Sequence, residues 1–343
     1  IRGMKTRLSH TFEDIVSVEN LLGAWREFLP GKSNKRDVQH FQRLLADCIV
    51  PLHDDLENGT YRHGAYTHFR IADPKPRDIH KATVRDRLVH HAIYRILYPF
   101  FSRTFIADSY SCQLEKGTHR AMERFKRFAY QVSTNNTRTC WVLKCDIRKF
   151  FASIDHGTLL GLLSERIPDE RTMTLLREVI ESFAWVPGKG LPLGNLTSQL
   201  FVNVYMTPFD QFVKHKLRAK HYVRYADDFV VLSHDRYELD RMIVEIERFL
   251  RKRLQLLLHP RKVSISTLAA GVDFLGWVHF PDHRILRTSS KRRMLKRIAD
   301  HPTQQTVQSY LGLLRHGHTR RLQELARDES YLFGGGKVAQ SGN

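Results

Sequence analysis

The strongest apolar pattern in this chain surrounds two adjacent aspartates. β-Branched and aromatic residues dominate positions 222–225 and 229–232, and between these runs stand Ala226, Asp227 and Asp228. Runs of this kind predict two short buried strands joined by a tight turn. Because adjacent strand residues point to opposite faces, only a turn brings both carboxylates toward one point. The pattern therefore predicts a β-hairpin with two carboxylates at its tip.

A third carboxylate follows another apolar run. Residues 141–145 predict a strand that ends in Asp146. Two negative charges at one point cost several kcal/mol unless a cation is present. For Asp227 and Asp228 alone, an ordinary Asp-rich turn is the alternative. With Asp146 added, three carboxylates can hold two divalent ions of the kind that catalyse in-line phosphoryl transfer, and Mg²⁺ suits such oxygen ligands.

The remaining pattern mixes helices with short strands. Alternation predicts strands across 60–80, broken by two prolines at 73–76. Helical spacing predicts two helices over 12–58, separated by a basic loop at 31–36. Further helices are predicted over 81–130, from near Asp155, and over 237–257, 289–299 and 303–315. The glycine-rich stretch from residue 334 onward predicts a flexible tail. We expect an α+β fold.

Composition narrows the class of partner. The chain has 343 residues, 42% of them hydrophobic, and a formal charge of +19, so we expect a folded protein that binds a polyanion. No apolar run approaches the ~20 residues that span a bilayer, and no secretory signal is visible, so no membrane partner is expected. The cysteines lack zinc-ligand spacing and are expected to be reduced thiols of a cytoplasmic protein: Cys48, Cys112, Cys140 and Cys145.

Several segments, in order along the chain, resemble the motifs of the reverse transcriptases. Besides the Asp-Asp hairpin they are 144–151, 190–199, 258–262 and 274–277. The resemblance implies a right-hand polymerase with an antiparallel palm sheet backed by helices. It implies an N-terminal helical extension over 1–59 and fingers over 60–140. The palm is then expected over 141–284, a helical thumb over 285–333 and a flexible tail over 334–343.

The resemblance also implies catalytic roles, those of an RNA-directed DNA polymerase. Asp146, Asp227 and Asp228 are then the catalytic residues and, with Ile147, the ligands of two Mg²⁺ ions, for which Mn²⁺ can substitute. One ion lowers the pKa of the attacking primer hydroxyl, and the other neutralises charge on the leaving pyrophosphate. The cations expected near the triphosphate are Lys75, Arg77 and Lys262, with Lys262 as a candidate general acid. A solvated basic turn is the alternative for Lys75 and Arg77.

The residues expected around the nucleotide include one that matches the family pattern, Phe151, and one that departs from it, Leu193. Phe151 matches the steric gate, an aromatic ring that leaves no room for a ribose 2′-hydroxyl, so DNA is the expected product. Leu193, Gly194 and Gln199 are expected nucleotide contacts. Most relatives carry Gln-Gly and then Ser-Pro there, and loss of that glutamine weakens a check on base-pair geometry. The Leu-Gly and Ser-Gln combination resembles the reverse transcriptases of diversity-generating retroelements, which copy a template RNA with errors at adenines.

Binding of the duplex is expected farther along the chain. Residues that resemble the primer grip are Phe274, Leu275, Gly276 and Trp277. Basic thumb residues expected to contact duplex phosphates are Lys291, Arg292, Arg293, Lys296 and Arg297. The implied partners are template RNA, the RNA–DNA duplex, deoxynucleoside triphosphates and a small basic helical accessory protein.

Other functions stay open. An anti-phage defence reverse transcriptase shares the palm and often the compact size, and either role implies a bacterial or phage-encoded protein. A non-catalytic RNA-binding scaffold is the alternative from another class. Three mutually repelling acids in a basic protein argue against the scaffold. The histidine pairs at 90–91 and 316–318 lack ligand partners at metal spacing and are not expected to bind metal.

Overall fold

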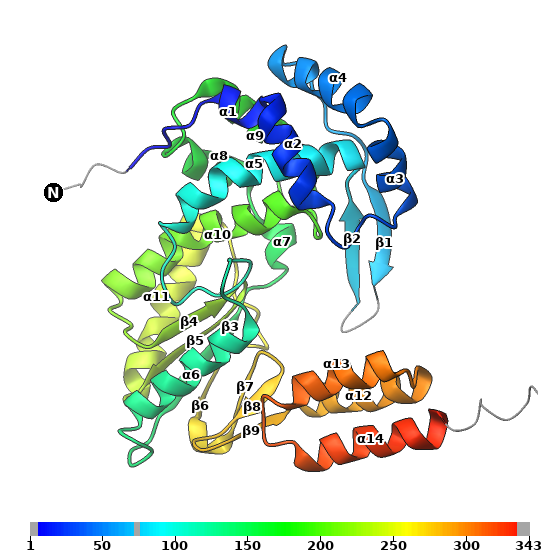
Figure 1. Cartoon of the computed structure of the whole chain (residues 1–343). Coiled ribbons are helices and arrows are strands. Elements are labelled where there is room, and N and C mark those ends of the chain that lie inside the picture. The colour runs from blue at the N-terminus through cyan, green and yellow to red at the C-terminus, as the bar shows by residue number, and fades with distance from the viewer. Residues whose placement is uncertain (1–5, 72–75, 335–343) are drawn as a thin grey trace, which may run out of the picture.

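The computed structural model describes residues 6–71 and 76–334. Lys75, expected near the triphosphate, lies outside the described residues, as do residues 335–343 of the tail expected over 334–343. Figure 1 shows a group of helices at the top, a β-sheet below them, and a small helical bundle beside the sheet. In the described part of the chain, no helix is both long enough and apolar enough to cross a membrane.

The central sheet has four antiparallel strands in the order β4-β5-β3-β6. The strands are β3 (Trp141–Asp146), β4 (Tyr222–Tyr225), β5 (Asp228–Ser233) and β6 (Ser264–Thr267). The predicted strand ending in Asp146 and the predicted hairpin are both present. One difference is that Asp228 is the first residue of β5 and not part of the turn, because it pairs with Tyr225 and leaves Ala226 and Asp227 to connect the strands.

Both faces of this sheet are covered, since side chains alternate along each strand. On one face the strands contribute Leu143, Cys145, Phe229 and Val231 to the main core. On the other face Val142, Val230 and Leu232 pack with Phe125 and Phe128 of α6 (Thr118–Val132). The main core also contains residues of α10 (Leu196–Gln211), which lies above the sheet in Figure 1, and of α11 (Arg236–Leu254).

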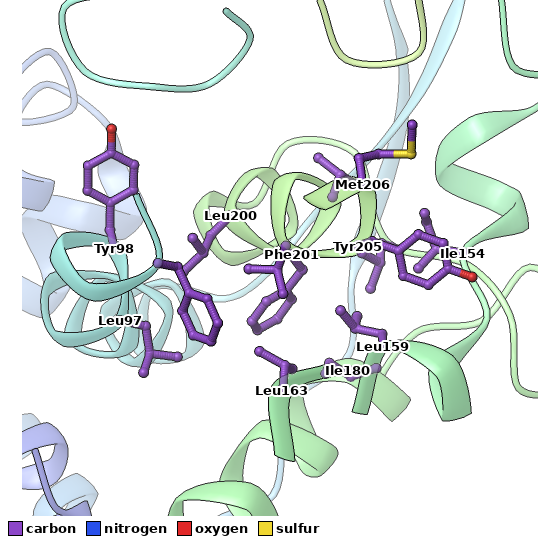
Figure 2. Packing of buried hydrophobic residues seen from close by; sticks show 14 of the residues in the cluster. Leu97, Tyr98, Ile154, Leu159, Leu163, Ile180, Leu200, Phe201, Tyr205 and Met206 are labelled. Atoms are coloured by element: carbon purple, nitrogen blue, oxygen red, sulfur yellow. The ribbon is translucent and has the colours of Figure 1, made fainter. Parts of the chain in front are cut away.

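The upper helices are α1 (Phe12–Val16), α2 (Val18–Phe28), α3 (Arg36–Arg43), α4 (Leu45–Glu57), α5 (Val84–Ser102), α8 (His156–Ser164) and α9 (Glu170–Glu181). Among them, α5 and α8 pack against α10, and the others pack against α5, against α8 or against one another. Figure 2 shows Phe201 of α10 between Leu97 of α5 and Leu163 of α8. Fully burying one such phenylalanine contributes about 1.5–3 kcal/mol. A short helix, α7 (Phe150–Ser153), follows β3 directly.

Two helical predictions were too simple. Residues 12–58 form four helices instead of two, because Ser17 accepts a hydrogen bond from the Asn20 backbone N–H and starts a new helix after α1. The stretch 103–117 is not helical. Its backbone pairs with the edge of β4 instead: Arg224 donates to the Asp108 carbonyl at 3.0 Å, and Tyr110 donates to the Arg224 carbonyl at 2.9 Å.

The strand prediction over 60–80 was too long. The hairpin consists of β1 (Thr67–Ile71) and β2 (Arg77–Lys81). The preceding residues are held to helices by side chains and not by a strand partner: Tyr61 Oη donates to Asp86, and the His63 backbone N–H donates to Glu178.

The C-terminal part has a second sheet and a helical bundle. The sheet is β7 (Val272–Phe274), β8 (Trp277–His279) and β9 (Arg284–Leu286), and the bundle is α12 (Thr288–Asp300), α13 (Gln304–Leu314) and α14 (Arg320–Gly334). The segment 274–277, expected to open a single hairpin, is itself the turn between β7 and β8, with positive φ at Leu275 and Gly276. Trp277 and Leu286 share a core with Met294 and Ile298 of α12, so this sheet joins the bundle to the rest of the molecule.

Candidate active site

The strand register brings Asp146 and Asp228 together. They are directly paired across β3 and β5, a position where Cβ atoms lie about 4.5–5.5 Å apart. Asp227 precedes Asp228 in the turn, and its carbonyl accepts a hydrogen bond from the Ile147 N–H at 3.1 Å. Ala226 has a φ of 56°, a left-handed conformation that is strained for a residue with a Cβ. The sequence thus folds into one cluster of the three predicted carboxylates and Ile147.

The charge of these carboxylates is only partly compensated by nearby cations. Burial raises the pKa of Asp228 to about 7; Lys144 opposes this shift, and the charges of Asp227 and Asp146 add to it. Its Oδ1 is buried without a hydrogen-bond partner among the described residues. Burial, and then the charge of Asp146, also raises the pKa of Asp227, whereas Lys262 and Arg77 lower it. The site therefore favours added positive charge.

Lysine ammonium groups stand against two of the acids. Lys262 Nζ lies 3.0 Å from Asp146 Oδ2, and Lys144 Nζ lies 3.7 Å from Asp228 Oδ2. As they stand, no three His, Cys, Asp or Glu side chains of the described chain are gathered closely enough to hold a metal ion. The donor set still fits a divalent ion, because it consists of carboxylate oxygens, one of them buried and unpaired. Loading requires Lys262 to move away from Asp146, and an exposed lysine can do so.

The predicted nucleotide contacts lie on elements joined to this cluster. Arg77 begins β2 and is exposed, and its charge lowers the pKa of Asp227. The Leu193 carbonyl accepts a hydrogen bond from His80 of β2 at 3.2 Å. A Cβ added at Gly194 would lie 3.1 Å from Ile79 Cγ2, so glycine permits this close approach to the hairpin. The β1–β2 hairpin and the 190–194 loop are therefore in contact.

The proposed gate is attached to the same loop. The Phe151 carbonyl accepts from the Leu191 N–H at 2.9 Å, and its half-buried ring meets Phe150 edge-on at 5.6 Å between centroids. Phe150 is buried in the core, as expected for one of this pair. Gln199 is half-buried on the first turns of α10.

The predicted primer grip is linked to the acids by a lysine. Lys144 Nζ donates to the carbonyl of Asp273, immediately before the turn that contains Leu275 and Gly276. Phe274 and Trp277 are themselves buried and pack into two different cores. On α12, Met294 and Ile298 face the bundle core. Of the thumb residues expected to contact duplex phosphates, four are exposed: Lys291, Arg292, Lys296 and Arg297. Arg293 is half-buried and has an interaction of its own.

Two residues of this region were missed by sequence reasoning. Lys144 precedes Asp146 by two positions on β3, so strand alternation alone places it on the face of Asp146. Arg224 is a fully buried arginine within an apolar strand, and such a charge requires a buried partner. That partner is Asp210 of α10, which accepts from Arg224 Nε at 2.8 Å and from Nη2 at 2.7 Å.

The fold and the acid cluster define a class of protein, the right-hand polymerases. The fold is shared with telomerase of Candida albicans bound to a fragment of telomeric RNA, with a TM-score of 0.50, 10% identity, and coverage of 72% of this chain and 51% of that one. Apo telomerase of Candida tropicalis matches with a TM-score of 0.53, 10% identity, and coverage of 73% and 53%.

Sequence comparison gives the family. Residues 72–279, more than half of the chain, match the family described as reverse transcriptase (RNA-dependent DNA polymerase), and the chain belongs to this family. It is 25% identical over 290 residues to protein YkfC of Escherichia coli, covering 73% of this chain and 74% of that protein. It is 23% identical over 316 residues to the group II intron-encoded protein LtrA of Lactococcus lactis, covering 71% of this chain and 51% of LtrA. The chain thus matches only about half the length of LtrA.

Proposed function

We propose that this protein copies an RNA template into DNA by two-metal nucleotidyl transfer. The observation that carries this proposal is the pairing of Asp146 with Asp228 beside Asp227, with a buried Asp228 oxygen to which no described residue donates a hydrogen bond. Asp146, Asp227, Asp228 and Ile147 would hold two Mg²⁺ ions, or Mn²⁺ in their place. When bound, such ions lower the pKa of a primer 3′-hydroxyl and stabilise charge on the leaving pyrophosphate.

The chain's own cations handle the triphosphate. Arg77 projects from β2 on the side where its charge acts on Asp227, which suits a phosphate oxygen near the metal site. Lys262 leaves Asp146 when the site is loaded, and its ammonium then donates a proton to the pyrophosphate oxygen that departs. Lys75, two residues before Arg77, is assigned to the same triphosphate from the family motif alone.

Phe151 selects the sugar. Its carbonyl accepts a hydrogen bond from the Leu191 N–H, which joins the residue to the 190–194 loop. Phe151→Ala is expected to raise ribonucleotide incorporation while deoxynucleotide addition continues. Single-nucleotide addition with paired dNTP and rNTP substrates measures this ratio. An unchanged ratio would remove Phe151 from the sugar site.

Leu193 supports the finer proposal of low-fidelity copying in a diversity-generating retroelement. Its side chain offers only apolar contact where a glutamine amide would hydrogen-bond, and one such bond contributes about 0.5–1.5 kcal/mol. Leu193→Gln is therefore expected to lower misincorporation opposite template adenine by up to about tenfold, as 1.4 kcal/mol corresponds to a factor of ten. Gly194 and Gln199 complete this contact surface. Sequencing of cDNA from both proteins tests the difference.

The remaining predicted residues would bind the duplex. The β7–β8 turn, with Phe274, Leu275, Gly276 and Trp277, would hold the primer end near Lys144, and the exposed basic side of α12 would contact duplex phosphates. Residues 60–140, 141–284 and 285–333 then serve as fingers, palm and thumb after a helical extension over 1–59. A small basic helical accessory protein is the proposed protein partner.

The decisive experiment is primer extension by the purified protein on an RNA template with Mg²⁺. Asp227→Asn serves as the inactive control, and the products are sequenced by template base. Synthesis by the wild type alone, with errors concentrated at adenines, supports both parts of the proposal. Accurate synthesis would overturn the retroelement role and favour a defence enzyme. If no synthesis occurs, even with native RNA and neighbouring gene products, the chain acts as a scaffold.

A further inference from the structure

We propose that a cavity between α6, the β8–β9 turn and the α13–α14 connection binds a phosphate-bearing ligand, namely a segment of single-stranded RNA. The cavity has a volume of about 470 Å³. This lies within the ~300–1,000 Å³ typical of ligand sites and can hold one nucleotide. Its lining residues come from segments far apart in sequence, around 125–129, 279–284 and 315–318. We call it the junction cavity.

The lining of the junction cavity is strongly basic. Lys126, Arg284 and Arg315 carry permanent positive charge, and four histidines accompany them: His279, His283, His316 and His318. Among the described residues that line it, Asp282 is the single acid, and its Oδ1 lies 2.8 Å from His283 Nδ1. A concave surface with this excess of cations attracts anions.

Arg284 carries a donor that has no acceptor. Its Nε donates to the His316 carbonyl, and its Nη2 donates to Glu123 at 2.8 Å. Its Nη1 is buried and has no hydrogen-bond partner within the described chain. Leaving a buried donor unpaired costs about 1–3 kcal/mol, and more for a charged group, so few native donors stay in this state. The Arg284 guanidinium lies 5.9 Å from the centre of the Trp277 ring, and a turn of this side chain toward the cavity would give Nη1 a phosphate oxygen as acceptor.

Flat rings beside these cations suit a nucleic-acid base. Phe280 stacks on His283 with ring centroids 4.8 Å apart, and His283 meets His318 edge-on at 5.9 Å. Sites for single-stranded nucleic acid combine a positive groove with aromatic platforms, and each stacked base contributes about 1–3 kcal/mol. Because the cavity offers rings as well as cations, it is better suited to bind a nucleotide of single-stranded RNA than inorganic phosphate.

The junction cavity is separate from the catalytic carboxylates but lies on the same small sheet. The β7–β8 turn, tied to Lys144, is at one end of β8, and the cavity begins at His279 at the other end. Three strand residues span roughly 10 Å. Gly317 lets the α13–α14 connection approach this closely, because a Cβ there would lie 2.0 Å from the Trp277 ring. An RNA strand whose nucleotide is bound in the cavity can therefore continue toward the hairpin that carries Asp227 and Asp228.

RNA as the source of the phosphate rests on the proposed function, whereas phosphate binding by the cavity does not. The first test compares wild type with Lys126→Ala/Arg315→Ala. Both side chains are exposed, so their loss leaves the core intact. The charge-matched control is Lys252→Ala/Arg253→Ala, two exposed residues near the end of α11. Anisotropy of a labelled single-stranded RNA is measured over a range of salt concentrations.

Each lost phosphate contact lowers the slope of log K against log salt by ~0.7, so the cavity variant is expected to lose about 1.4 in slope. The control variant is expected to keep a slope closer to that of wild type. Equal slopes for the two double variants would overturn the inference.

A second test locates the strand. With p-benzoylphenylalanine placed at position 283, irradiation is expected to crosslink the RNA, and unlabelled RNA is expected to compete. No crosslink would overturn the inference, and complete competition by millimolar mononucleotide would overturn RNA as the ligand. Addition of one nucleotide to a short duplex is measured on the same wild-type preparation. Its failure beside a positive crosslink would count against the proposed polymerase activity and not against the cavity.

Discussion

Two carboxylates near the Asp-Asp hairpin, buried Asp210 and half-buried Asp228, have opposite surroundings. Asp210 accepts hydrogen bonds from Arg224 Nε and Nη2 at 2.8 and 2.7 Å and from Tyr222 Oη at 2.7 Å. Asp228 has one buried oxygen without a partner among the described residues, and its other oxygen lies 3.7 Å from Lys144 Nζ. The chain neutralises the first carboxylate and leaves the second short of positive charge.

The Asp210 charge stabilises the fold, whereas the Asp228 charge is the one we propose to be available for a metal ion. Arg224 also donates from Nη1 to the Ala226 carbonyl at 3.1 Å, so the satisfied pair holds the strained turn that carries Asp227. Nη2 of the same arginine donates to Ser109 Oγ at 2.9 Å, which ties in the 103–117 segment. The fully paired Asp210 thus helps to stabilise the backbone that carries Asp227 and Asp228.

The largest expected effect follows from removing one unpaired acid. Asp227→Asn is expected to lower single-nucleotide addition by about 10³-fold, because metal ions supply several kcal/mol of transition-state stabilisation and each 1.36 kcal/mol is tenfold. The midpoint of urea unfolding, measured without metal, should stay equal or rise. Activity within tenfold of the wild type would show that Asp227 does not carry charge needed for catalysis.

Breaking the satisfied pair should instead affect folding. Arg224→Met leaves Asp210 buried and unpaired, and losing one partner of a buried ion pair costs about 3–5 kcal/mol. Urea unfolding measures the loss. In the double variant Arg224→Met/Asp210→Leu much of it should return, since apolar replacement of a buried pair is often neutral. A single variant as stable as the wild type would contradict the structural role.

The unpaired acid should make stability depend on pH and metal. The pKa of Asp228 is raised from 3.8 to about 7, so the folded state binds its proton more tightly than the unfolded state does. The free energy of unfolding should therefore fall as pH rises from about 4 through 7, and the loss should be complete above 7. Without metal, Asp228→Asn should gain stability relative to the wild type between pH 5 and pH 8.

Metal should reverse this loss. At pH 8, Mg²⁺ at about 100 times its dissociation constant should stabilise the wild type by ~2.7 kcal/mol. Asp228→Asn should show a smaller shift in melting temperature on the same titration. Equal metal-induced shifts in both proteins would place the ion elsewhere.

The smallest effect is expected at the exposed ion pair. The Lys262 side chain is 45% exposed beside Asp146, and surface pairs of this kind contribute about 0–1 kcal/mol. Lys262→Met should therefore change the free energy of unfolding by less than about 1 kcal/mol in urea titrations. A cost comparable to that of Arg224→Met would show that the lysine belongs to the fold and is not free to leave the acid.

Much of the fold was predictable where the signals are local. The apolar runs around Ala226, Asp227 and Asp228 form the expected hairpin, and Asp155 starts α8 by accepting a hydrogen bond from the Thr158 N–H. The 103–117 segment was not predictable, because its backbone pairs with β4, more than a hundred residues later in the chain. The division of residues 272–286 into a three-stranded sheet depends likewise on a core shared with α12.

The sequence by itself determined the kinds of chemistry present: three acids at strand ends, an aromatic residue after Asp146, and a basic chain suited to a polyanion. These follow from periodicity and turn residues, which act between near neighbours. Only the tertiary structure decided which charges are neutralised. Lys262 pairs with Asp146, 116 residues away in the sequence, and Arg224 pairs with Asp210 of α10. Asp228 has one oxygen without a hydrogen-bond partner among the described residues. Burial and pairing depend on contacts between distant segments, and the cost of an unpaired charge arises only when folding removes the water around it.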